Sequence, residues 1–210
     1  MQCPLCADYT DTVLTSQQKK YYHCSQCDMI FLDPKQRPKE KEEKARYLAH
    51  DNTIADKGYV SFLEDFLQQG VDPFIASGMA LDYGCGPGPV LQMLLQQRGF
   101  STDIYDPFFA PEKPPAHKKF DLITCTEVLE HVYQPTKTWR YFAQHLRPGG
   151  YLAIMTYFHP GLKNFDRWWY RQDFTHVCFY SRLTFAWVAA NHPFQEKFTD
   201  NQRIVVLKRC

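Results

Sequence analysis

The sequence lacks long apolar segments, a strong net charge, internal repeats and low-complexity stretches. No apolar run reaches the roughly 18 residues of a membrane-spanning helix, and residues 1–30 lack the apolar core of a secretory signal. A cytoplasmic protein without a membrane partner is therefore expected. Lysine and arginine total 24 against 23 acidic residues, which gives no electrostatic support for nucleic acid as a general partner. The 210 residues are enough for one full domain and a small module.

Cysteine, in contrast, is plentiful, and four of the eight cysteines form two close pairs. Cys3 and Cys6 form one CxxC pair, Cys24 and Cys27 form another, and seventeen residues separate them. This is the spacing of a zinc ribbon, in which two turns bring four thiolates to one tetrahedral Zn²⁺. A site closed by four cysteines predicts a structural ion, and so short a segment is expected to fold only with its metal. Residues 1–33 are predicted to form this ribbon, with a core of its own.

The rest of the chain predicts a doubly wound, mostly parallel α/β sheet. Residues 34–77 are expected to link the two parts through a charged, solvated connector at 33–46 and an amphipathic helix at 58–69. From residue 78 to 210, strand and helix patterns alternate, as in a parallel sheet with helices on both faces. Strands are predicted at 79–83, 100–105, 120–125 and 151–156, helices at 90–99, 139–146 and 183–191, and a terminal antiparallel pair at 194–199 and 203–208.

A glycine loop follows the first of these strands. Gly84, Gly86 and Gly88 let the chain turn sharply and let a ligand lie against bare backbone, and the next helix offers free N–H groups. Asp106 closes the next strand, where an acid can accept hydrogen bonds from ribose hydroxyls. The GxGxxG fingerprint of dinucleotide sites is not met, so a different nucleotide-like ligand is expected.

Three ordered motifs identify a family resemblance. The segments LDYGCGPG, FDLITCTEVLEHV and LRPGGYLAIMT lie within residues 78–157 and resemble the successive motifs of class I S-adenosylmethionine-dependent methyltransferases. The leading cysteine pairs and residues 169–181 are further similar to a bacterial subfamily of small methyltransferases. The resemblance implies a Rossmann-like fold, S-adenosylmethionine as cofactor, and methyl transfer by direct in-line displacement.

The same resemblance implies the cofactor contacts. The glycine loop would hold the methionine part, Asp106 the ribose, and residues 124–127 the region near the sulfonium. Only thirteen residues separate Asp106 from Phe120, too few for the helix and strand that the family usually places there, so residues 107–109 are expected to cover the adenine. The predicted cofactor-binding residues are Asp82, Gly84, Gly86, Gly88, Asp106, Pro107, Phe108, Cys125, Thr126 and Glu127.

His131 and His176 are the predicted catalytic residues, because an imidazole near neutral pKa suits a general base. His176 is expected to face the transferable methyl as base or substrate anchor; the alternative is a bond to a backbone carbonyl that only shapes its loop. His131 could equally have a structural role. Glu127, Glu130 and His131 also resemble an acidic cluster that holds a divalent ion in some quinone O-methyltransferases, but the further acid of those enzymes cannot be identified here, so a catalytic metal is not expected.

A small molecule is the predicted methyl acceptor. Five aromatic residues could wall its pocket, and core packing is expected for at least half of them: Trp168, Trp169, Tyr170, Phe174 and Phe179. A second interpretation is an RNA or protein methyltransferase that docks through the ribbon, with a basic stripe at Lys19, Lys20, Lys35 and Arg37. A third is a non-catalytic cofactor-binding adaptor, against which the intact glycine loop and Asp106 argue.

Overall fold

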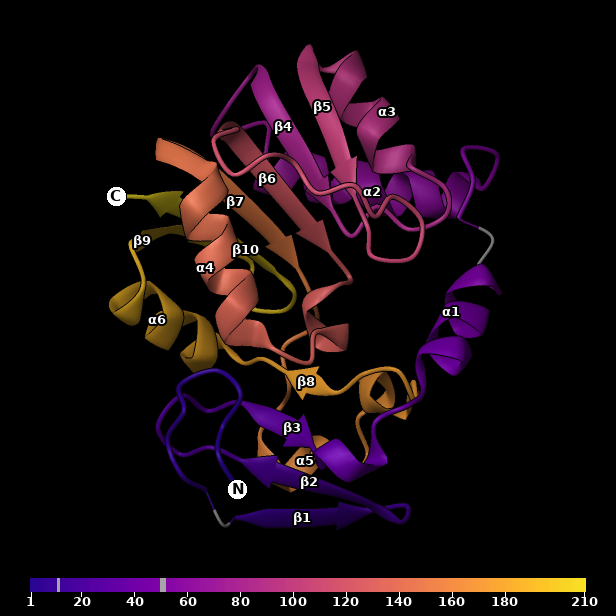
Figure 1. The fold of residues 1–210 in the computed structure, drawn as a ribbon, viewed down its shortest axis with the longest axis vertical. Coiled ribbons are helices and arrows are strands. Elements are labelled where there is room, and N and C mark those ends of the chain that lie inside the picture. The colour runs from indigo at the N-terminus through magenta and orange to yellow at the C-terminus, as the bar shows by residue number, and fades with distance from the viewer. Residues whose placement is uncertain (11, 50–51) are drawn as a thin grey trace.

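A computed structural model describes residues 1–10, 12–49 and 52–210 and contains two sheets (Figure 1). The larger sheet has the strand order β5-β4-β6-β7-β10-β9. Its strands are β4 (Gly78–Tyr83), β5 (Phe100–Tyr105), β6 (Phe120–Thr126), β7 (Leu146–Met155), β9 (Phe194–Thr199) and β10 (Ile204–Arg209). The first four strands in this order are parallel, and β10 pairs antiparallel with both β7 and β9. The predicted mostly parallel, doubly wound sheet is confirmed.

Helices cover both faces of this sheet because consecutive strand residues point to opposite sides. Ala80 and Leu122 pack in one buried cluster with α2 (Lys57–Gly70) and α3 (Val90–Gln97). Their neighbours Leu81 and Ile123 belong to the other cluster, with α4 (Pro135–His145) and α6 (Arg182–Asn191). Asp56 starts α2 by accepting hydrogen bonds from the N–H groups of the first turn.

Two boundaries differ from the sequence prediction. The helix α4 begins at Pro135, where proline is pre-organised for a first helical position, and ends at His145. The strand β7 begins at Leu146, not at the predicted residue 151, and includes Gly149 and Gly150; its pairing with β6 moves from Leu146 directly to Tyr151. The short connection after β5 is confirmed, because residues 107–119, all of them described, contain neither a helix nor a named strand.

The ribbon does not have a core of its own. Its strands β1 (Val13–Ser16), β2 (Lys19–His23) and β3 (Ile30–Leu32) share a sheet with β8 (Cys178–Phe179), a strand from the far end of the chain. The fully buried Tyr21 packs its ring 5.1 Å from that of Phe165. The prediction of a separate core is wrong because strands this short cannot bury their apolar side chains against one another.

The connector is more ordered than expected. It contains the 3₁₀ turn η1 (Pro34–Gln36) and the helix α1 (Glu40–Leu48), which Figure 1 shows on the right, beside the gap between the two sheets. Glu43 on α1 is buried. Three short elements complete the fold: η2 (Leu129–His131), α5 (Leu162–Phe165) and η3 (Trp169–Gln172). No helix among the described residues combines the length and apolarity needed to cross a bilayer.

Candidate active site

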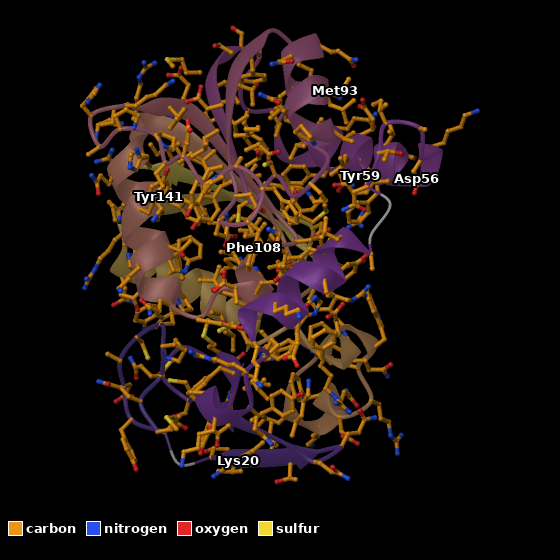
Figure 2. The ribbon with its side chains drawn as sticks, turned by 45° about the vertical axis from the view of Figure 1, so that its right-hand side comes forward. Lys20, Asp56, Tyr59, Met93, Phe108 and Tyr141 are labelled. Carbon is orange, nitrogen blue, oxygen red and sulfur yellow. The ribbon has the colours of Figure 1, made fainter. Side chains whose placement is uncertain are left out.

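A cavity of about 1090 Å³ lies at the carboxyl ends of β4, β5 and β6. This is the edge at which open parallel sheets bind ligands. Its walls come from α1, α2, the loops after the three strands, and the segment between β7 and α6, here called the wall segment (residues 156–181). Figure 2 places Phe108 near the centre of the molecule and Tyr59 to its right, on α2; both line the cavity.

The three loop glycines serve three different purposes. Gly84 has φ +88°, and a side chain there would collide with Val128. Gly88 lies against the backbone carbonyl of Asn52, which a Cβ would hit. Gly86 has φ +64°, and an added Cβ would have no described heavy atom within 4 Å outside its chain neighbours. Because Gly86 also lines the cavity, the space above it is open to a ligand.

Asp106 organises the loops around this space. Its Oδ1 accepts hydrogen bonds from the N–H groups of Phe108 at 2.8 Å and Phe109 at 3.1 Å, and its Oδ2 accepts one from Gly86 N–H at 3.2 Å. One carboxylate therefore ties the aromatic turn after β5 to the glycine loop. The ring of Tyr47, from α1, lies 5.6 Å from that of Phe108 and 5.1 Å from that of His131, between the aromatic turn and the histidine.

Most of the predicted cofactor residues line the cavity, and two do not. Asp82, Gly84, Gly86, Asp106, Pro107, Phe108, Thr126 and Glu127 all contribute to its walls. Burial raises the pKa of Asp82 to about 7. The expectation for Cys125 needs correction, because its side chain is fully buried on the opposite face of β6 from Thr124 and Thr126. Gly88 is corrected too, since it makes room for Asn52.

A single tyrosine hydroxyl lies between two carboxylates at the cavity wall. The Tyr170 O–H lies 2.5 Å from Glu130 Oε1 and 3.1 Å from Glu127 Oε2, while Thr156 O–H donates to Glu130 Oε2 at 2.8 Å. Glu127 Oε1 is buried and has no hydrogen-bond partner among the described residues. Burial, and then the charge of Glu130, raise the pKa of Glu127 well above its usual range. Among the described residues, Glu127 is thus a buried carboxyl whose neutral form is favoured by its surroundings.

His131 and His176 lie together at this wall, with their ring centres 4.8 Å apart. Each Nδ1 contacts a backbone carbonyl, His131 that of Thr175 at 3.1 Å and His176 that of Tyr170 at 2.6 Å. A carbonyl only accepts, so each Nδ1 carries the proton and each Nε2 is left as an acceptor. Burial lowers the pKa of both histidines to about 4, so both are neutral at pH 7. His176 thus both lines the cavity and bonds a carbonyl.

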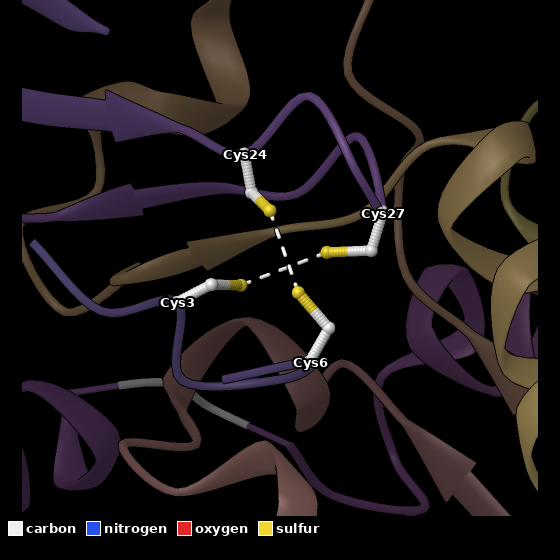
Figure 3. Close-up of side chains that lie close together, drawn as sticks. All are labelled: Cys3, Cys6, Cys24 and Cys27. Carbon is white, nitrogen blue, oxygen red and sulfur yellow. Dashed lines mark hydrogen bonds between the residues drawn. The ribbon is translucent and has the colours of Figure 1, made fainter. Parts of the chain in front are cut away.

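The four paired cysteines converge on one point (Figure 3). The sulfur of Cys3 lies 3.6 Å from that of Cys27, and the sulfur of Cys6 lies 3.4 Å from that of Cys24. Sulfurs bound tetrahedrally at about 2.3 Å from one Zn²⁺ are separated by about 3.8 Å. The residues present therefore fit a closed tetrathiolate site.

A second group of possible metal ligands lies in the cavity. The ligand atoms of Glu130, His131 and His176 lie within 4.8 Å of one another. Glu127, which the sequence grouped with Glu130 and His131, is not part of this described group. The residues that converge here are therefore not the three that resemble the quinone methyltransferase cluster.

The aromatic segment divides between cavity and core. Trp169, Tyr170 and Phe174 line the cavity, whereas Trp168 and Phe179 pack against the buried cluster below it. Sequence analysis missed the contribution of α1, whose residues Glu43, Arg46 and Tyr47 also line the cavity. These residues lie at positions i, i+3 and i+4, which share one face of a helix. The charged residues around them hid this pattern.

Comparisons with known proteins identify the family of the main domain. The family described as "Methyltransferase domain" matches residues 55–195. A ubiquinone biosynthesis O-methyltransferase from Pseudomonas fluorescens is 33% identical over 84 residues, which cover 39% of this chain and 35% of that protein. The chain thus matches about a third of the length of its curated relatives.

Solved structures share the fold at low identity. A Burkholderia thailandensis 1,6-didemethyltoxoflavin-N1-methyltransferase, solved with that compound and S-adenosylhomocysteine, is 13% identical, with a TM-score of 0.51 over 93% of this chain and 97% of that one. An O-methyltransferase family 2 protein from Planctomyces limnophilus, in complex with apigenin, is 14% identical, with a TM-score of 0.57 over 83% and 64% of the two chains. The family match spans most of the sheet, the glycine loop and both histidines, and the chain belongs to this methyltransferase-domain family.

Proposed function

We propose that the protein transfers a methyl group from S-adenosylmethionine to a small-molecule acceptor by direct in-line displacement. The observation that carries this proposal is the open space above Gly86, bounded by Asp106 and continuous with the cavity that reaches both histidines. In this proposal the methionine part lies on the glycine loop near Asp82, and residues 107–109 cover the adenine. Thr126 and Glu127 lie near the sulfonium.

The acceptor would occupy the other end of the cavity, between α1 and the wall segment. Tyr47, Tyr133, Trp169 and Phe174 provide flat apolar surfaces there, which suit an aromatic acceptor. The two similar structures named above hold 1,6-didemethyltoxoflavin and apigenin, which makes hydroxylated and nitrogen-containing aromatic rings the first compounds to try.

His176 is the proposed base or substrate anchor, with His131 as its neighbour. Both imidazoles are neutral at pH 7 and keep one nitrogen free to accept a proton. In-line displacement needs the acceptor atom, the methyl and the sulfur in one line, so holding the acceptor is as important as removing its proton. The four cysteines would hold a structural Zn²⁺ in the ribbon.

Calorimetric titration with S-adenosylhomocysteine, followed by transfer assays on hydroxyarenes and aromatic nitrogen heterocycles, tests the proposal. We expect one S-adenosylhomocysteine to bind per chain. We also expect S-adenosylmethionine to be converted to S-adenosylhomocysteine only when an acceptor is present. His176→Ala should retain cofactor binding and lose transfer. Absence of cofactor binding to the folded protein would contradict the proposal. Transfer to RNA or protein but to no small molecule would favour the docking interpretation.

A further inference from the structure

The wall segment leaves the main sheet at the end of β7 and returns at the start of α6. Along the way it supplies Tyr170, Asp173 and His176 to the cavity. Its base is closed by a hydrogen bond from the His159 N–H to the Tyr180 carbonyl at 2.8 Å. The position of these cavity residues therefore depends on what holds the segment in place.

One ribbon residue holds both ends of the wall segment. Asp28 directly follows Cys27, and its Oδ2 accepts a hydrogen bond from the Ser181 hydroxyl at 2.6 Å. Its backbone carbonyl accepts a second one from His159 Nε2 at 2.7 Å. Its Oδ1 lies 2.8 Å from His23 Nε2, which ties the same side chain to β2.

The ribbon also holds the middle of the segment, beside the catalytic candidates. Strand β3 pairs with β8, and the Leu32 N–H donates to the Val177 carbonyl at 2.9 Å. The Val177 N–H in turn donates to the Glu130 carbonyl at 2.7 Å. The residue after His176 is therefore fixed to the ribbon on one side and to the loop that carries His131 on the other.

The wall segment has little means of ordering itself. Its only strand, β8, has two residues, and its helical elements, α5 and η3, have four each. Elements this short are not stable alone in water and take their order from what they pack against. Here they pack against the ribbon, whose own folding is expected to need its metal.

We propose that the ribbon is the scaffold of the acceptor half of the cavity, and that Asp28 is the positioning residue that fixes His176 and Tyr170 there. The word "acceptor" rests on the function proposed above. That the ribbon orders residues 159–181 does not depend on that function and can be measured without turnover.

A series of Asp28 variants at full zinc occupancy tests this proposal. Asp28 has φ +57°, so Asp28→Gly removes the side chain without backbone strain, and Asp28→Asn keeps an oxygen acceptor in a residue that tolerates this conformation. Asp8→Gly is the matched control, because the Asp8 carboxylate accepts a hydrogen bond only from its neighbour Tyr9 among the bonds described. Zinc content is measured for each variant.

Asp28→Gly should speed amide hydrogen exchange in residues 159–181 by about tenfold or more, the scale of a lost hydrogen bond to a charged group. Exchange in β4 and β6 should stay within about twofold of the wild type. The ring signals of His176 should shift toward those of a solvated histidine. Asp28→Asn should restore most of the protection, and Asp8→Gly should match the wild type.

Unchanged exchange of residues 159–181 in Asp28→Gly would overturn the proposal. An equal rise in exchange throughout β4 and β6 would overturn it too, since Asp28 would then contribute to general stability only. Titration with S-adenosylhomocysteine on the same samples separates the two claims. If the wild type fails to bind it, the proposed function falls while the exchange result still decides the role of Asp28.

Discussion

The two halves of the cavity are built in different ways. The half proposed to bind the cofactor, here called the cofactor half, comes from residues 82–86, 105–109 and 126–128. Each of these lies at the carboxyl end of a parallel strand, and backbone N–H groups and glycines shape this half. The acceptor half is assembled from α1, the loop after β6 and the wall segment, and it is shaped by a network of side chains. Strand order alone positions the first half, whereas the second depends on contacts between distant parts of the chain.

This difference has a physical basis. Parallel strands 4.8 Å apart present their carboxyl ends side by side, so short motifs after each strand meet without further help. Side chains on loops and short helices have no such frame and need partners at both ends.

Cys24→Ser should affect both halves, because the ribbon and the methyltransferase sheet share one buried cluster. Losing the proposed structural Zn²⁺ should cost on the order of 5 kcal/mol or more, a large part of a typical folding free energy. We expect a single unfolding transition with Tm lower by about 15 °C, measured by calorimetry. Two transitions, the larger of them at the wild-type temperature, would show that the ribbon is independent after all.

Gly86→Val should disable the cofactor half alone. A valine there would fill the space above the loop and weaken S-adenosylhomocysteine binding by about a hundredfold or more, about 2.7 kcal/mol. Gly161→Val is the matched control, since Gly161 has φ +85° and equally open space among the described atoms, and it does not itself line the cavity although it lies in the wall segment. Both variants should lose about 1–3 kcal/mol of stability to backbone strain. Equal binding losses in calorimetric titration would place the cofactor elsewhere.

His176→Gln should change how stability depends on pH. The folded pKa of about 4 lies below the unfolded value, so the unfolded chain binds more protons between pH 6.5 and 4 and stability falls as the pH is lowered. Asp82 and Glu127, whose pKa values are raised, contribute in the opposite sense, so the variant must be compared with the wild type. Between pH 7 and pH 5, His176→Gln should lose about 2 kcal/mol less of its free energy of unfolding than the wild type loses. Urea unfolding at the two pH values measures this difference. As a control, His117→Gln at an exposed position should lose as much stability between pH 7 and pH 5 as the wild type. If His176→Gln also loses as much as the wild type, the imidazole of His176 is solvated.

Arg46→Met should have the smallest effect on stability. The Arg46 and Asp173 side chains form a 2.7 Å ion pair between α1 and the wall segment, and 36% of the arginine side chain is exposed. Such pairs contribute less than about 1 kcal/mol, so Tm should fall by no more than about 3 °C. A double-mutant cycle with Asp173→Asn measures the coupling. A coupling well above this would make α1 a firmly fixed wall of the acceptor half.

The sequence predicted the cofactor half far better than the acceptor half. The glycine loop, Asp106 and the short connection before Phe120 could be read because each lies beside a strand whose pattern is strong. Cys125 was predicted to face the cofactor, but strand alternation points its side chain to the opposite face of β6. Gly88 was predicted to contact the cofactor, and its contact with Asn52, far away in the sequence, could not be foreseen from local pattern. The face of α1 that carries Tyr47 was hidden in a charged segment that reads as solvated. The strand β8 is too short to leave any pattern, so the shared core of ribbon and sheet could not be foreseen.

The raised pKa of the Glu127 carboxyl couples its ionisation to the charge of whatever binds beside it in the cavity. S-adenosylmethionine carries one more positive charge than its demethylated product, and in the proposed complex that charge lies near Glu127. Binding the charged form should therefore lower the pKa of Glu127 and favour release of a proton to the buffer, whereas binding the product should leave that pKa raised. The heat of binding would then vary with the ionisation enthalpy of the buffer for the cofactor and not for the product. Raising the pH would strengthen the first interaction relative to the second, so the charged cofactor would displace spent cofactor more readily at higher pH.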